Sequence, residues 1–202
     1  MFLSALAGFV DGTGFVLTRG LFVSFMSGNS TRFSVGIAER SGVAFLAGGL
    51  IVLFLAGVVA GALLSAWKPV RRKTIVLTSS TFGLALSAAL VSLSLPTAGA
   101  LVLAAAMGSL NNVFLRDGEV SIGVTYMTGT LVRAGQRIAG AVRGEGPSDW
   151  LPYLLLWGSL ASGATAGGLV ATWEVTTAIW AAVAAAASIS VFTHRLEAAA
   201  HQ

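Results

Sequence analysis

The chain contains two copies of one unusual segment. Residues 22–38 align without a gap with residues 123–139, at a constant offset of 101 residues. Identical pairs include Val23 and Val124, Met26 and Met127, Gly28 and Gly129, and Arg32 and Arg133. At an offset of 106, Gly57, Gly61 and Trp67 align with Gly163, Gly167 and Trp173. This repetition predicts a duplicated unit, with a first repeat of about residues 1–95 and a second of about 96–202. The matched glycine pairs predict close helix contact between the halves.

The composition excludes a surface that faces water. Hydrophobic residues make up 55% of the chain and charged residues only 10%, whereas soluble domains have about a quarter charged. The mean hydropathy is +0.85. Apolar stretches of bilayer-spanning length cover residues 42–66, 74–95, 150–172 and 175–193, and shorter ones cover residues 2–17 and 98–115. The sequence therefore predicts a single, all-α integral membrane domain.

The repeated segments, residues 20–38 and 121–139, allow two topologies. If each is a full span, the halves have four helices each and repeat in parallel. If each is broken or re-entrant, the halves have three helices each and are inverted. With residues 68–73 in the cytoplasm, six spans place nine basic residues inside and three outside, whereas eight spans place six on each side. The positive-inside rule thus favours six spans with both termini cytoplasmic, and ordinary kinked helices remain the alternative.

Several motifs resemble one known family. They are Gly8-Phe9-Val10-Asp11, Gly20-Leu21-Phe22-Val23, Met26-Ser27-Gly28-Asn29 and Thr125-Tyr126-Met127-Thr128-Gly129-Thr130. With these motifs the chain resembles the YoaK-like family of small bacterial inner-membrane proteins, over nearly its whole length. The resemblance implies a multi-pass protein of about six helices in the bacterial inner membrane. It implies no particular activity.

The duplicated triplets Ser27-Gly28-Asn29 and Thr128-Gly129-Thr130 predict a break in each segment. A break at membrane depth survives only if it is buried in protein or lines a watery cavity. It exposes helix-end N–H groups, which are typical of sites for polar or anionic solutes in transporters with discontinuous helices. The predicted solute site therefore comprises the two triplets with Phe25, Tyr126, Arg32 and Arg133. The alternative is that the glycines serve packing, the hydroxyls bond to their own helices and the arginines snorkel to the interface.

Asp11 is the one acidic residue well inside an apolar stretch, and it aligns with Asn112 in the second half. An isolated carboxylate in a membrane is costly, so Asp11 is the first candidate for proton or cation coupling. Asn112 would be its neutral counterpart. The alternative is that both residues cap the broken segments through hydrogen bonds.

Other chemistries find little support. The chain has no cysteine, His194 and His201 lie near the C-terminal end, and no acidic cluster or phosphate-binding loop is present. We therefore expect no enzymatic activity, no cofactor and no metal, and we assign the net charge of +4 to cytoplasmic loops rather than to nucleic-acid binding. The predicted function is a secondary transporter of a small polar or anionic solute at the repeat interface, with proton coupling as an option. The alternatives are a passive channel with the same lining and a non-transporting membrane scaffold. Homo-oligomerisation remains open.

Overall fold

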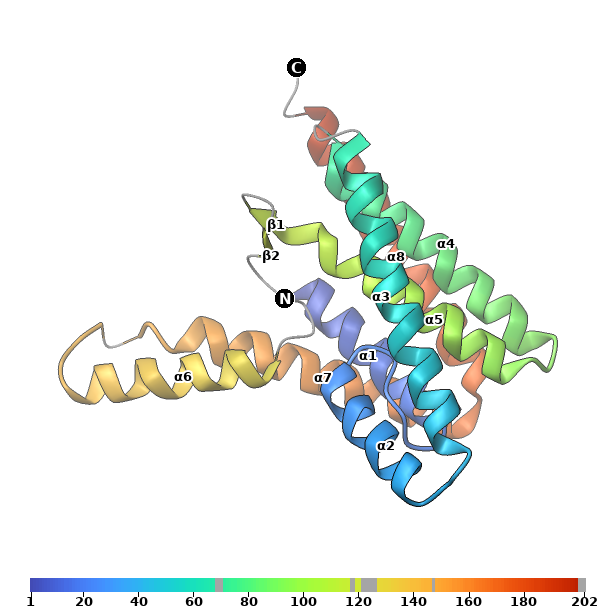
Figure 1. The fold of residues 1–202 in the computed structure, drawn as a ribbon. Coiled ribbons are helices and arrows are strands. Elements are labelled where there is room, and N and C mark those ends of the chain that lie inside the picture. Colours follow the sequence, from blue (N-terminus) through green and yellow to red (C-terminus); the bar gives the residue numbers. More distant parts are fainter. Residues whose placement is uncertain (68–70, 117–118, 121–126, 147, 200–202) are drawn as a thin grey trace.

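The computed structural model describes residues 1–67, 71–116, 119–120, 127–146 and 148–199. This part of the chain is almost entirely helical (Figure 1). Its helices are α1 (Phe2–Leu17), α2 (Met26–Ala38), α3 (Val43–Trp67), α4 (Arg72–Ser92), α5 (Pro96–Leu110), α6 (Met127–Val142), α7 (Leu151–Trp173) and α8 (Val175–Ala199). A short 3-10 helix, η2 (Asn111–Phe114), follows α5, and β1 (Leu115–Arg116) then pairs antiparallel with β2 (Glu119–Val120).

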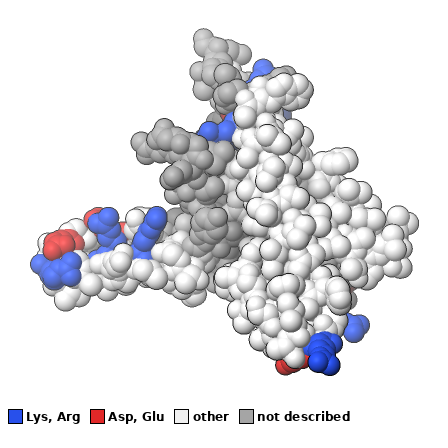
Figure 2. Space-filling view, in the orientation of Figure 1, with Lys and Arg blue, Asp and Glu red and all other residues white. Residues whose placement is uncertain are grey.

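Four helices, α3, α4, α7 and α8, are long and apolar enough to cross a membrane. They contain 25, 21, 23 and 25 residues, and a helix of 20 residues spans the hydrocarbon core of about 30 Å. This agrees with the four long apolar stretches in the sequence. On the face shown in Figure 2, the charged side chains of the described residues gather at the extremities, and most of the described surface between them is uncharged. The fold is that of an all-helical, multi-pass membrane protein.

Within the described residues, the duplicated segments form two short helices. Helix α2 has 13 residues and α6 has 16, and neither is among the four helices that are long and apolar enough to cross a membrane. The predicted position of the break at Ser27-Gly28-Asn29 is wrong, because these residues lie inside the first turn of α2 and the non-helical segment precedes them. Thr128-Gly129-Thr130 is likewise helical, at the start of α6. Residues 121–126 lie outside the described part of the chain.

The first helix of each half packs against a helix of the other half. Helix α1 packs along α7, and α5 packs along α3. Glycines stand at both crossings: a Cβ at Gly163 or Gly167 would overlap the backbone of Ala5 or Phe9, and one at Gly57 would overlap the backbone of Ala105. The paired helices therefore touch backbone to backbone, which only small residues permit. The expected close contact between halves at the two glycine motifs is present.

The directions of the packed helices differ between pairs. On α4, Thr74, Thr78 and Ser92 bond to Glu197, Ser190 and Trp180 of α8, at 2.6, 3.0 and 3.4 Å. Partner numbers on α8 fall as those on α4 rise, so these helices are antiparallel. By the same reasoning, the contacts of Gly163 with Ala5 and of Gly167 with Phe9 make α1 and α7 parallel. Helices α3 and α5 are also parallel, because Gly49 faces Leu101 and Gly57 faces Ala105.

A single residue, Glu174, joins α7 to α8. Its carboxylate accepts hydrogen bonds from the backbone amides of Thr177 and Thr176, and so caps the first turn of α8. Hydrogen bonds from Thr177, and then from Thr176, lower the pKa of Glu174 from 4.5 to about 2. The side chain is exposed and lies between two helices that are each long enough to cross a membrane, so we expect this junction at a membrane surface.

We expect Gly163→Ala to destabilise the protein by about 1–3 kcal/mol, because the added methyl group pushes α7 away from α1. Gly168→Ala on the same helix is the control. No described heavy atom lies within 4 Å of a Cβ at Gly168, so this change should be neutral or slightly stabilising. Thermal unfolding of the two variants in detergent measures the difference, and equal unfolding midpoints would contradict the backbone contact.

Candidate functional site between α1 and α2

The chain leaves α1 through a sharp turn. The amide of Arg19 donates to the Val16 carbonyl at 3.2 Å, and that of Gly20 donates to the Phe15 carbonyl at 2.9 Å. Arg19 and Gly20 have φ of 57° and 112°, in the left-handed region that favours glycine. After this turn the backbone is non-helical up to Phe25, so its amides have no helical partners.

Three polar side chains supply the missing partners. The Leu21 amide donates to the Thr18 hydroxyl at 3.0 Å. The Phe22 amide donates to Asn29 Oδ1 at 2.9 Å, and Asn29 Nδ2 donates back to the Phe22 carbonyl at 2.6 Å. The next two amides, of residues 23 and 24, both donate to Asp11 Oδ1, at 3.0 and 2.8 Å. Every amide in residues 21–24 thus has a side-chain acceptor, which a buried backbone requires in a membrane.

The break is also packed tightly. Asn29 and Val23 are fully buried, and Phe22 forms ring contacts with Phe15 and Phe25 at 5.0 and 5.1 Å between centroids. A Cβ at Gly28 would lie 2.6 Å from the Phe25 ring, so this glycine makes room for the aromatic rings. Here the packing explanation of Gly28 fits the geometry. Phe25 itself is 38% exposed, just before the first turn of α2.

The hydroxyls of α2 bond along their own helix. Ser30 donates to the Met26 carbonyl at 2.8 Å, and Thr31 to the Ser27 carbonyl at 3.3 Å. Such bonds satisfy each hydroxyl locally. The Arg32 guanidinium lies over the turn, since Nη2 is 3.7 Å from a Cβ placed at Gly20. Among the described residues, no ion pair joins Arg32 to Asp11.

The second half uses its matching residues differently. Asn112 Nδ2 donates to the Val58 carbonyl of α3 at 3.0 Å and to the Ser109 carbonyl at 3.2 Å, so it ties the end of α5 to α3. On α6, Thr130 is buried, whereas Thr128 and Gly129 are exposed. Tyr126 lies outside the described residues. Arg133 is exposed on α6.

The structure does not bring the two triplets together. Helix α2 packs on α3 and α6 packs on α7, and they lie on separate sides of the molecule (Figure 1). A site shared by Ser27-Gly28-Asn29 and Thr128-Gly129-Thr130 is therefore not formed in this conformation.

Hydroxyl groups at the interface between the halves were not predicted. Thr78 on α4 bonds to Ser190 on α8, and Ser79 on α4 lies 3.4 Å from Ser109 on α5. The Ser80 hydroxyl is buried and has no hydrogen-bond partner in the described structure. The run Thr78-Ser79-Ser80-Thr81 could have indicated these hydroxyl groups. It is easily overlooked, because residues 74–95 are apolar on average.

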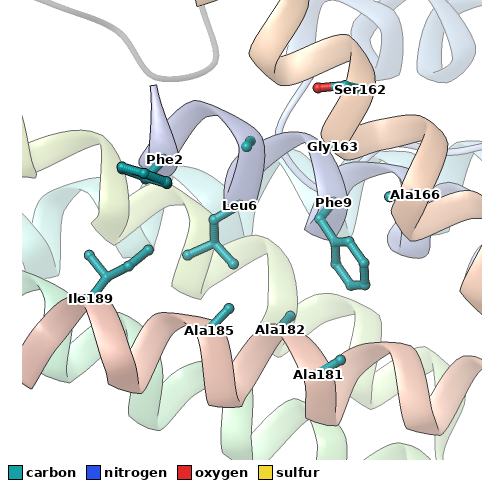
Figure 3. A pocket seen from close by; sticks show the side chains of 11 residues that line it. Phe2, Leu6, Phe9, Ser162, Gly163, Ala166, Ala181, Ala182, Ala185 and Ile189 are labelled. Carbon is teal, nitrogen blue, oxygen red and sulfur yellow. The ribbon is translucent and has the colours of Figure 1, made fainter.

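A cleft of about 510 Å³ opens between α1, α7 and α8. Figure 3 shows Phe2, Leu6 and Phe9 of α1 across from alanines and Ile189 of α8. Its lining is apolar, so it does not fit a polar or charged solute. Among the described residues, no group of three His, Asp or Glu side chains is placed to hold a metal ion.

Helices of bilayer length, charges at their ends and an internally satisfied break define a multi-pass membrane protein. Residues 1–192 match the family described as "Protein of unknown function (DUF1275)", and the chain belongs to this family. It is 31% identical over 178 residues to a UPF0700 transmembrane protein of Rhizobium meliloti (strain 1021), a match covering 88% of this chain and 77% of that protein. No solved structure gives a significant match. The comparisons confirm a family of membrane proteins, and neither match carries the YoaK-like name.

We expect Asp11→Ala to be more damaging than Asp11→Asn. Alanine leaves the amides of Val23 and Ser24 without an acceptor, at about 1–3 kcal/mol for each unsatisfied group. Asparagine keeps an oxygen that can accept both bonds. The measurement is the thermal unfolding midpoint of the purified variants, with Ser27→Ala on exposed α2 surface as a control that should behave as the wild type. An Asp11→Ala midpoint equal to that of Asp11→Asn would show that the carboxyl oxygen does not hold the break.

Proposed function

We propose that the chain is a secondary transporter of a small polar or anionic solute, built from six membrane-crossing segments in two inverted halves. The observation that carries this proposal is the antiparallel packing of α4 on α8. If α2 and α6 both crossed the bilayer, α4 and α8 would be the fourth and eighth crossings and would run in the same direction. Without those two crossings they are the third and sixth, and run in opposite directions.

The other packed pairs agree with six crossings. Helices α1 and α7 become the first and fifth crossings, and α3 and α5 the second and fourth, so each pair is parallel, as observed. The contacts also exchange between halves: α1 with α7 corresponds to α5 with α3, and α2 with α3 corresponds to α6 with α7. Inverted repeats of this kind are typical of secondary transporters, in which one half rocks against the other.

The hydroxyl groups at the contact between the halves support a polar route for the solute. Thr78, Ser79 and Ser80 lie on the helix that contacts both α5 and α8 of the second half. A buried hydroxyl without a partner, as at Ser80, is a group that a polar solute or water could satisfy. In this proposal the solute passes between the halves at these hydroxyls when the halves separate. Ser27 and Thr128, with their neighbours, contact the solute on α2 and α6, at opposite faces of the membrane.

Proton coupling through Asp11 is part of the proposal. Its carboxylate holds the break, so protonation would weaken two backbone hydrogen bonds and favour movement of α2. The alternative is a membrane scaffold that transports nothing. The contacts of Asp11, Asn29 and Gly28 also fit this alternative, because all three residues hold the fold together. The proposal includes no enzymatic step and no cofactor, and places the protein in the bacterial inner membrane with both termini cytoplasmic, from the distribution of basic residues.

The inverted arrangement predicts that the α2–α3 and α6–α7 turns face opposite sides of the membrane. The chain has no cysteine, so Gly42→Cys and Ser148→Cys each introduce a single label site. Both positions are exposed. A membrane-impermeant thiol reagent added to intact cells should label one variant, and the other only after the membrane is opened. Labelling of both from the same side would refute the inversion.

Transport predicts saturable uptake into proteoliposomes. A thermal-shift screen of small metabolites on the purified protein selects the solutes to assay. We expect a pH gradient to stimulate uptake, and Asp11→Asn to abolish the stimulation while the protein stays folded. Ser148→Cys, in a surface turn, is the matched control and should retain it. Uptake that never saturates would favour a channel, and no uptake of any screened solute by folded protein would favour a scaffold.

A further inference from the structure

Helix α6 has two unlike exposed faces. Leu131, Ile138 and Val142 are spaced seven and four residues apart, so they share a face, and they are 42%, 41% and 83% exposed. Arg133 and Arg137, four residues apart, share another face and are also exposed. The helix is therefore amphipathic, with apolar and basic surfaces that α7 does not cover.

This separation is a property of α6 and not of its duplicate. Helix α2 is three residues shorter, has Arg32 as its one basic residue and presents hydroxyls along its length. Arg143 directly follows α6 and is a third exposed arginine of the hairpin. Figure 2 shows basic side chains on the arm formed by the α6–α7 hairpin, with acidic side chains beside them at its tip.

The two faces indicate how α6 lies in a membrane. Helix α6 packs on α7 and is not a crossing in the proposed six-span arrangement. Exposed apolar side chains favour acyl chains, whereas guanidinium groups favour water and headgroups. A helix with both kinds of face lies in the plane of the interface, as basic amphipathic helices do.

An apolar notch of about 380 Å³ lies where α6 meets the start of α7. It is lined by Ile138, Ala141, Val142 and Trp150. Tryptophan is enriched at the boundary between headgroups and acyl chains. Arg137 precedes Ile138 and Arg143 follows Val142 in the chain, so two basic residues belong to the same hairpin as this apolar recess.

The arginines near the notch remain accessible. Arg137 lies 3.9 Å from Asp149, and Arg143 lies 3.3 Å from Glu145. All four side chains are more than half exposed, and ion pairs of this kind contribute little. Arg133 forms no ion pair in the described part of the chain. Guanidinium groups bind phosphate through paired hydrogen bonds, so these arginines suit a phosphodiester.

We propose that the α6–α7 hairpin binds an anionic phospholipid, with its phosphate on Arg133, Arg137 and Arg143 and the start of an acyl chain in the notch. The α2–α3 hairpin offers an internal comparison. It has an apolar notch of about 560 Å³ that includes Ile37 and Arg40, but Arg32 and Arg40 are eight residues apart and lack the four-residue spacing of Arg133 and Arg137. That notch should not distinguish anionic from zwitterionic lipid.

The test is lipid binding to the full chain in detergent, measured by native mass spectrometry with phosphatidylglycerol and phosphatidylcholine. We expect the wild type to prefer phosphatidylglycerol. Each arginine near a membrane surface changes anionic-lipid affinity by about fivefold. The triple variant Arg133→Gln, Arg137→Gln, Arg143→Gln should therefore lose at least about tenfold in affinity for phosphatidylglycerol. The matched control Arg32→Gln, Arg40→Gln should keep the preference.

A second variant tests the notch without changing charge. Ile138→Gln should weaken binding of long-chain phosphatidylglycerol and leave binding of a short-chain analogue unchanged. Equal binding of both headgroups by the wild type would overturn the proposal, as would a preference that survives in the triple variant. So would crosslinks from Val142→Cys that join two copies of the chain, because α6 would then be a dimer contact. None of these measurements depends on transport, so failure here and failure of the transporter proposal are distinguishable.

Discussion

The fold depends on side chains that satisfy the backbone where α1 gives way to α2. In water the amides of residues 21–24 could bond to solvent, but in a membrane each unsatisfied group costs several kcal/mol. Asp11 and Thr18 supply acceptors from α1 and its C-terminal end, and Asn29 supplies one from α2. They fix the exit from α1 and the entry into α2 in one arrangement. The Asp11 carboxylate is costly to bury in an apolar helix, but it stabilises the break by accepting two of its backbone hydrogen bonds.

Close backbone contact is the second constraint, and it determines how the halves combine. In lipid there is no hydrophobic driving force for helices to associate. Association therefore relies on dispersion contacts and on small residues that allow close approach. Gly163 and Gly167 on α7 meet Ala5 and Phe9, and Gly57 on α3 meets Ala105. The same device thus holds both crossings. The interface between α4 and α8 differs, because hydrogen bonds of the Thr74 and Thr78 hydroxyls cross it, to the Glu197 carboxylate and the Ser190 hydroxyl.

Much of the fold could be predicted from the sequence, because span length and apolar composition are local properties. The stretch at residues 150–172 corresponds to α7 at Leu151–Trp173, a shift of one residue at each end. The break was placed too late, at Ser27-Gly28-Asn29. Its true position depends on Arg19 adopting a left-handed conformation, which glycine usually provides, and on a partner twelve residues away from Val23, namely Asp11. Such tertiary hydrogen bonds leave no periodic signal, and neither does the bond of Asn112 to Val58.

The exchange of first helices between halves has a consequence for biogenesis. Helix α1 leaves the ribosome first, yet its glycine-bearing face finds its partner only when α7 emerges about 150 residues later. Until then the close-packing surface of α1 faces lipid or an insertion chaperone. Helix α5, in contrast, meets α3 already in place. Packing of α1 is therefore completed only after α7 is made, and truncation before α7 leaves α1 without this partner.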